Sequence, residues 1–188
     1  MTTEAASYLI RQFETAWKLA AYHLDGLSTA ECLWRPAARG LHVEQAADGR
    51  WHGQMPVHEG YDIGPPSIGW LTWHIGFWWS MVLDHSFGEG VLSHRDVLWP
   101  GSAAATEGWI CDLHDSWLRT LNRLTDAELA SSARTKWPFR ERRFGDVVAW
   151  VNVELTKNAA EIGYARFLYA ASAGAGQEVP AGASAPRS

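Results

Sequence analysis

Two segments of this chain place polar side chains where the spacing of apolar residues predicts the buried face of a helix. One is WLTWHIGFWWSMVLDH, which runs from Trp70 to His85 and contains His74 in the middle of its apolar side. Residues three, four and seven positions apart share a helix face, and the face that contains His74 also carries Trp70, Trp73, Phe77, Trp78 and Met81. The other segment is AWVNVELTKNAAEIGYARFL, in which Glu154 and Asn158 lie on one stripe.

These residue types could neutralise a buried charge or hold a metal ion. An ionised Glu154 inside a helical protein is costly unless it is paired, hydrogen-bonded, protonated or bound to a cation, and His74 is the obvious partner. An imidazole and a carboxylate with one further ligand also form a divalent-metal site that keeps a position open for water. His114, on the apolar side of another helical segment, is a reserve ligand, as are the loop histidines His42, His52 and His58.

A simpler interpretation of each residue stays open. A single histidine on an apolar face is most often a hydrogen-bonded core residue or stacks on a neighbouring tryptophan. Glu154 and Asn158 face water if the phase of their helix differs from the one assumed here. The aromatic stripe around His74 then belongs to the core and forms no pocket.

Four helical segments must position these side chains. Apolar spacing predicts helices from Ala6 to Leu24, from about residue 67 to His85, around His114, and from about Asp146 to Ala171. The third of these has two candidate N-caps, Ser102 and Thr106. LSTAECL and LTDAEL each predict a short capped helical turn after a long helix. The fold class is therefore all-α, a four-helix bundle whose site is built from inward-facing side chains.

The segment between the first two helices has a different composition. Residues 36–66 are rich in Gly, Pro and His, and LHVEQAADGRWHGQM reads as two short strands around a turn at Asp48 and Gly49. We expect a small β-hairpin insertion that covers a cavity. The helical domain spans residues 1–171, and the small, polar segment 172–188 is expected to be a disordered tail.

Composition argues against several partners. The net charge is −5, and the only local basic run is RERR at residues 140–143, which argues against nucleic acid. No apolar stretch reaches the roughly 18 residues of a membrane span, and the N-terminus has no signal-peptide pattern. Two distant cysteines fit a reducing compartment, so we expect a cytoplasmic protein. Twelve tryptophans predict an aromatic core edge or pocket wall.

PPSIGWLTWHIGFWW resembles the start of the second helix in the DinB/YfiT-like superfamily, where a proline-bearing loop leads into a helix whose histidine is the first ligand of a metal triad. AWVNVELTKNAAEIGYARFL resembles the last helix of that family, where the other two ligands are four residues apart. The resemblance covers about Ala6 to Ala171 and implies His74, Glu154 and Asn158 as the three metal ligands. Glu at the second position occurs in the branch that resembles mycothiol-dependent maleylpyruvate isomerase, whereas Asn158 departs from the usual histidine and is a poorer zinc ligand.

The resemblance implies one function, and the residues leave others open. Family members include transferases and isomerases in which a metal, here zinc or nickel, activates the sulfur of a low-molecular-weight thiol for attack on an electrophile. The pocket for that small molecule would be formed by Trp70, Trp73, Phe77, Trp78 and His114. The alternative is a metal-free protein that binds a small molecule or responds to stress, with His74, Glu154 and Asn158 hydrogen-bonded to one another. A third hypothesis is an interaction module that forms a homodimer through exposed helix faces, suggested by Trp79 and Trp109, which lie off the main stripes.

Overall fold

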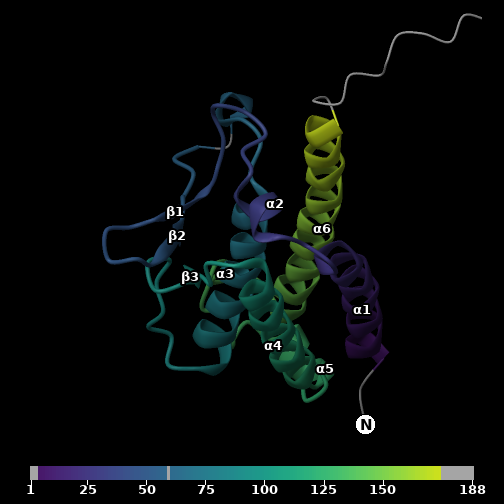
Figure 1. Cartoon of the computed structure of the whole chain (residues 1–188). Coiled ribbons are helices and arrows are strands. Elements are labelled where there is room, and N and C mark those ends of the chain that lie inside the picture. The colour runs from purple at the N-terminus through teal and green to yellow at the C-terminus, as the bar shows by residue number, and fades with distance from the viewer. Residues whose placement is uncertain (1–3, 59, 175–188) are drawn as a thin grey trace, which may run out of the picture.

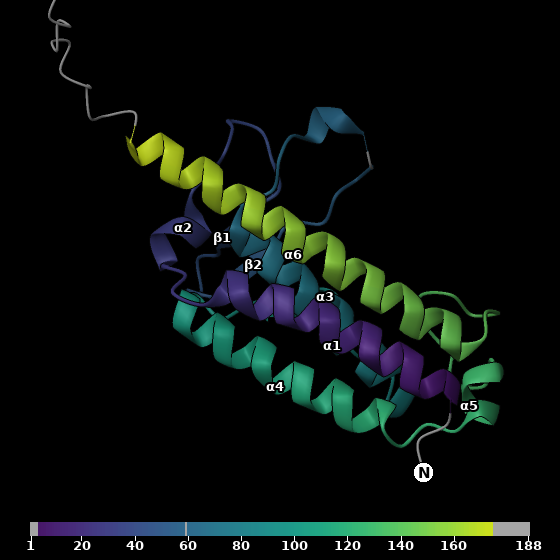
Figure 2. The same cartoon turned by 90° about the vertical axis from the view of Figure 1, so that its right-hand side faces the viewer.

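Four long helices form the body of the protein. The computed structural model describes residues 4–58 and 60–174, and within them the long helices are α1 (Glu4–Leu24), α3 (Ile68–Phe87), α4 (Ala103–Leu121) and α6 (Phe144–Gly174). They lie side by side, with α1 against α4 and α6, and α3 against the same two helices (Figures 1 and 2). The mostly helical fold class is confirmed.

Local capping signals set where the helices begin. The Ser67 side chain accepts a hydrogen bond from the backbone N–H of Trp70 at the start of α3, and Ser102, not Thr106, caps α4. The short helices α2 (Thr29–Leu33) and α5 (Asp126–Ala130) both begin with a complete capping box, as their sequences predict. Helix α6 extends to Gly174, three residues past its expected end. Residues 175–188, most of the predicted tail, lie outside the described residues.

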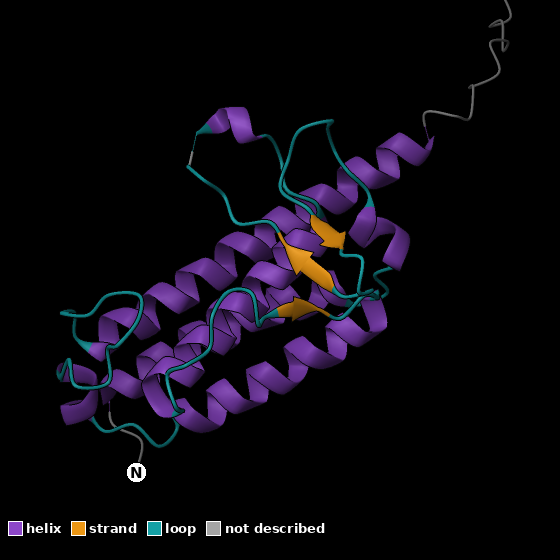
Figure 3. Cartoon of the chain, turned by 90° about the vertical axis from the view of Figure 1, so that its left-hand side faces the viewer, coloured by secondary structure: helices purple, strands orange, loops and turns teal. Residues whose placement is uncertain are grey.

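The expected hairpin is present and belongs to a larger sheet. Strand β1 (Val43–Gln45) pairs antiparallel with β2 (Trp51–Gly53), and Gly49 in the turn between them has a φ of +83°, a conformation that glycine adopts without strain. Strand β3 (Leu98–Trp99), which the sequence did not predict, pairs with the other edge of β2 (Figure 3). Two residues in a loop carry no strand periodicity, so β3 could be found only through its partner.

The sheet packs on α3 through Trp73. This side chain has no exposed surface, and its indole N–H donates to the carbonyl of Val97 at 2.8 Å. Gly53 of β2 lies directly over the ring, because a Cβ atom at this position would come within 2.0 Å of Trp73 Cδ2. The sheet therefore covers a face of α3 that the other three long helices leave open.

The two tryptophans that suggested an exposed interaction face do not form one. Trp79 is only 1% exposed and packs against Phe13 and Trp17 of α1. Trp109 is partly buried, with its ring end against Gly76 of α3. The reason is that α3 is apolar on nearly all sides and is covered by helices and sheet together. A homodimer stays a prediction, but these residues no longer support it.

A helix that crosses a membrane needs about 20 consecutive, mostly apolar residues. Among the described residues, none of the helices combines the length and apolar character required to cross a membrane.

We predict that Gly53→Ala destabilises the protein by about 1–3 kcal/mol, because the new methyl group overpacks a ring that cannot move away. Urea denaturation measures the effect. Gly108→Ala is the control, since a Cβ atom there meets nothing within 4 Å, and we expect it to stabilise α4 by about 0.5–1 kcal/mol. Wild-type stability in Gly53→Ala would show that the strand does not lie against Trp73.

Candidate functional site

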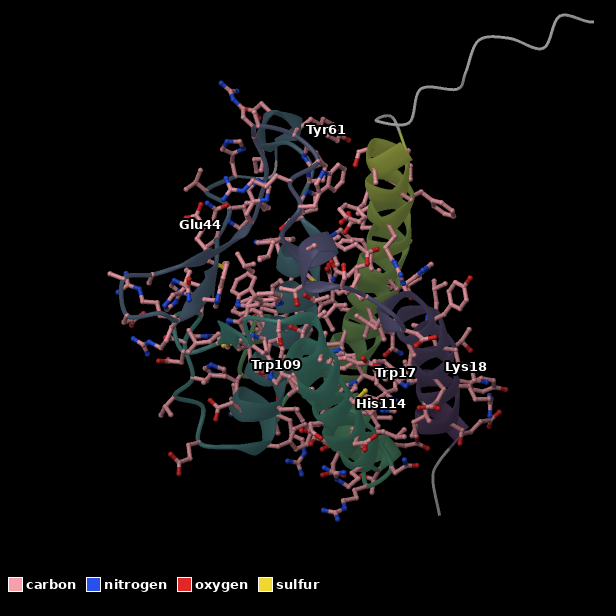
Figure 4. The ribbon with its side chains drawn as sticks, viewed as in Figure 1. Trp17, Lys18, Glu44, Tyr61, Trp109 and His114 are labelled. Atoms are coloured by element: carbon pink, nitrogen blue, oxygen red, sulfur yellow. The ribbon has the colours of Figure 1, made fainter. Side chains whose placement is uncertain are left out.

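A cavity of about 600 Å³ lies between α3, α6 and the segment that leads into α3. Helix α3 contributes Trp70, His74 and Trp78, which follow one another at four-residue intervals, and α6 contributes Glu154 and Lys157. The opposite wall comes from the insertion and includes Leu41, Pro56, Ile63 and Pro65. The short 3-10 helix η1 (Tyr61–Ile63) forms the outer end of this wall, where Tyr61 is fully exposed (Figure 4).

Both ring nitrogens of His74 are hydrogen-bonded. The indole N–H of Trp78 donates to Nε2 at 2.8 Å, and Nδ1 lies 3.2 Å from Oδ1 of Asn158. An indole N–H is only a donor, so Nε2 must be the unprotonated nitrogen. We therefore assign the proton to Nδ1, which donates it to the amide oxygen of Asn158. The His74 ring also stacks on Trp70, with centroids 4.5 Å apart.

The surroundings of His74 keep it neutral. Burial, and secondarily the positive charge of Lys157, lower the pKa of the imidazole from 6.5 to about 4, against a smaller opposing effect of the Asn158 hydrogen bond. At neutral pH the ring therefore has one donor and one acceptor nitrogen, and each is matched to a partner of the opposite kind.

Asn158 is completely buried on α6. Its oxygen accepts from His74, but its Nδ2 has no hydrogen-bond partner among the described residues. Rotating the amide would not solve this, because it would turn a donor toward the protonated Nδ1. Of the two helix phases that the sequence left open, the structure has the one that turns Asn158 inward, and the buried amide is committed to His74.

Glu154 lies at the cavity wall with its side chain 21% exposed. The ammonium group of Lys157 is 3.9 Å from a Glu154 oxygen and 3.6 Å from a Glu161 oxygen. The sequence reasoning missed Lys157 as a cavity residue. The sequence pattern that could have indicated Lys157 is the placement of Glu154 three residues before it and Glu161 four residues after it, on the same helix face.

The structure brings together only part of the predicted pocket. Trp70 and Trp78 line the cavity, whereas Trp73 faces the sheet and Phe77 stacks on Trp73 inside the core. The difference follows from helix geometry: positions 70, 74 and 78 share one edge of the aromatic face, and positions 73 and 77 occupy the other.

His114 is not part of this cavity, contrary to expectation. It lies between α4 and α1, where it stacks on Trp17 with ring centroids 4.2 Å apart (Figure 4). Its nitrogens contact Glu14 at 3.2 Å and Asp115 at 3.0 Å. The apolar stripe of α4 was recognised correctly, but it packs against both α3 and α1, and His114 lies at the contact with α1. His114 is therefore a satisfied residue at a helix interface.

The loop histidines also separate. His58 lines the cavity, His52 lies in β2, and His42 is buried with neither ring nitrogen hydrogen-bonded to a described residue. Residues 4–58 and 60–174 contain no group of three or more His, Cys, Asp or Glu side chains close enough to hold a metal ion.

These features define a mostly helical protein with a small antiparallel sheet and a cavity between two of its long helices. A sequence model of the DinB superfamily matches residues 12–162, and the chain belongs to that superfamily. Comparisons with curated proteins and with solved structures gave no significant match.

We predict that His74 makes the protein less stable as the pH falls from 6.5 to about 4. In this window the unfolded chain binds a proton that the folded chain excludes, so the contribution of His74 to the free energy of unfolding falls by roughly 3 kcal/mol and does not change at lower pH. Urea denaturation across pH measures the slope. It should become shallower in His74→Gln and stay unchanged in His94→Gln, which alters an exposed loop histidine. Equal slopes in all three proteins would contradict the burial of a neutral His74.

Proposed function

We propose that this protein binds a small organic molecule in the cavity between α3 and α6 without a resident metal ion. The observation that carries the proposal is the hydrogen bond from the Trp78 indole to His74 Nε2. This bond occupies the lone pair with which a neutral imidazole binds a metal. The other ring nitrogen carries the proton donated to Asn158, so His74 has no nitrogen left for coordination.

The remaining donors also fit a metal poorly. Asn158 offers a neutral amide oxygen that already accepts from His74, and Glu154 is neighboured by the Lys157 ammonium. Zinc and nickel sites are built from thiolates, imidazoles and carboxylates whose lone pairs face the ion. As arranged, His74 and Asn158 favour a hydrogen bond with each other, and Glu154 favours its contact with Lys157.

The wall chemistry points to an amphipathic ligand. Trp70, Trp78 and the apolar side chains of the insertion offer flat and aliphatic surface for an apolar or aromatic body. Glu154 and Lys157 at the α6 side supply one acceptor and one donor for a polar group. A cavity of about 600 Å³ accommodates a molecule of metabolite or drug size.

The second candidate is the metal-dependent transferase or isomerase that uses a low-molecular-weight thiol. It is favoured by the fact that the three positions implied as ligands converge: His74 contacts Asn158, and Glu154 lines the same cavity. This function requires the Trp78 indole to release Nε2 when zinc or nickel binds. A cytoplasmic location is compatible with either candidate.

We predict that the wild-type protein, exposed to zinc and then desalted, retains substoichiometric metal, and that Asn158→His retains close to one ion per chain. The new imidazole replaces a poor zinc ligand with a good one, so zinc competes better with the Trp78 indole for Nε2 of His74. Elemental analysis makes the measurement, and the double variant His74→Ala/Asn158→His should lose the ion again. Stoichiometric metal in the wild type would favour the thiol-dependent enzyme instead.

We predict that the neutral fluorescent probe N-phenyl-1-naphthylamine binds the wild-type protein and that Ile63→Trp weakens this binding. The larger side chain fills a cavity that Ile63 lines. Fluorescence titration gives the affinity. Val57→Trp is the matched control, because Val57 belongs to the same loop, is 94% exposed and does not line the cavity. Equal affinity in all three proteins would place the probe elsewhere and count against a ligand site here.

A further inference from the structure

A second cavity, of about 490 Å³, lies at the other end of α3. One side is formed by His85 near the end of that helix and by Gly90 in the loop that follows. The other side comes from the connection between α5 and α6 and consists of Ser132, Thr135, Lys136, Trp137 and Arg140. It shares no lining residue with the cavity between α3 and α6, and the proposed function does not involve it.

The charge of this cavity is opposite to that of the chain. The protein has a net charge of −5, yet the lining includes Lys136 and Arg140 and no carboxylate. Neither cation forms an ion pair with a described residue. Arg134 nearby differs, since its Nε lies 3.1 Å from Glu128. Two uncompensated cations on one wall create a local positive potential that attracts anions.

Thr135 gives an independent indication of a ligand. The residue is only 2% exposed, and its hydroxyl has no hydrogen-bond partner among the described residues. Buried hydroxyl groups are normally hydrogen-bonded, because leaving one unsatisfied is costly. An anion bound in the cavity that Thr135 lines would accept a hydrogen bond from this hydroxyl group.

Trp137 supplies an apolar surface beside the charges. Its ring stacks on His85 with centroids 5.9 Å apart, and the imidazole is fixed by an Nε2 contact of 2.9 Å with the carbonyl of Leu92. The cavity therefore combines two cations, a hydroxyl donor and a flat ring. Such a combination suits an anionic group attached to an organic body better than a free inorganic ion.

We propose that this second cavity binds a small organic anion, a phosphate monoester or a carboxylate. Lys136 and Arg140 attract and pair with its charge, the Thr135 hydroxyl donates to one of its oxygens, and Trp137 contacts the organic part.

Calorimetric titration of the full chain with phenyl phosphate, inorganic phosphate and benzoate tests this proposal. We expect at least one organic anion to bind, and the stronger of phenyl phosphate and benzoate identifies the anionic group. Lys136→Gln/Arg140→Gln should weaken binding by roughly tenfold or more. The control Lys18→Gln/Arg123→Gln changes the net charge by the same amount. Both residues are exposed and lie outside the cavity lining, with Lys18 on the outer side of α1 (Figure 4), so the affinity should stay nearly unchanged.

Thr135→Val separates a ligand contact from a structural role. It should weaken anion binding several-fold while leaving the thermal midpoint unchanged or higher, because the hydroxyl it removes has no partner in the protein. The proposal is overturned if neither phenyl phosphate nor benzoate binds, whether or not inorganic phosphate does, or if the two charge variants lose affinity equally, since that would indicate only long-range attraction. Neither result would bear on binding of the neutral probe to the other cavity.

Discussion

Burial of His74 between two helices forces its imidazole to stay neutral and to find a partner for each nitrogen. The Trp78 indole satisfies one from the next turn of α3, and Asn158 satisfies the other from α6. The Trp78 indole can only donate, so Nε2 of His74 must accept and Nδ1 must carry the proton. The tautomer of His74, the orientation of the Asn158 amide and the lateral position of α6 against α3 are therefore fixed together. The edge of the cavity is thus built from a polar cluster that also joins two helices.

The opposite wall of the cavity depends on how the insertion is attached to α3. The Trp70 indole donates to the carbonyl of Gln54 at 2.7 Å, and the Gln54 side chain accepts from the backbone of His42. At the helix start, the Ser67 amide donates to the carbonyl of Leu41 at 2.9 Å. The same helix turn that presents Trp70 to the cavity therefore also holds the chain that closes it. A polar tie of this kind is needed because the insertion contributes few buried apolar residues of its own.

Sequence reasoning succeeded where a signal is local and failed where it depends on a neighbour. Helix caps and the hairpin turn follow from spacing within one segment, and both are confirmed. The spacing left the phase of Asn158 open, and the structure buries it. The β3 strand could not be predicted, because two residues carry no periodicity and form a strand only beside β2. The surroundings of His114 could not be predicted either, because an apolar stripe shows that a helix face is buried but not which helix covers it. Trp79 was misjudged for a related reason: α3 is enclosed on almost every side, so a residue off its main stripe is still buried.

The hydrogen bond between Trp78 and His74 has an evolutionary consequence. Positions 74, 78 and 158 form a unit in which a change at one position alters the hydrogen bonding of the others. An N–H donor at position 78 is compatible with an amide at position 158, since each serves a different nitrogen of one neutral ring. In a lineage that binds a metal here, an indole at 78 competes with the ion for the same lone pair, so tight binding favours exchange of both positions. Substitutions at 78 and 158 should therefore covary among homologues that keep the histidine.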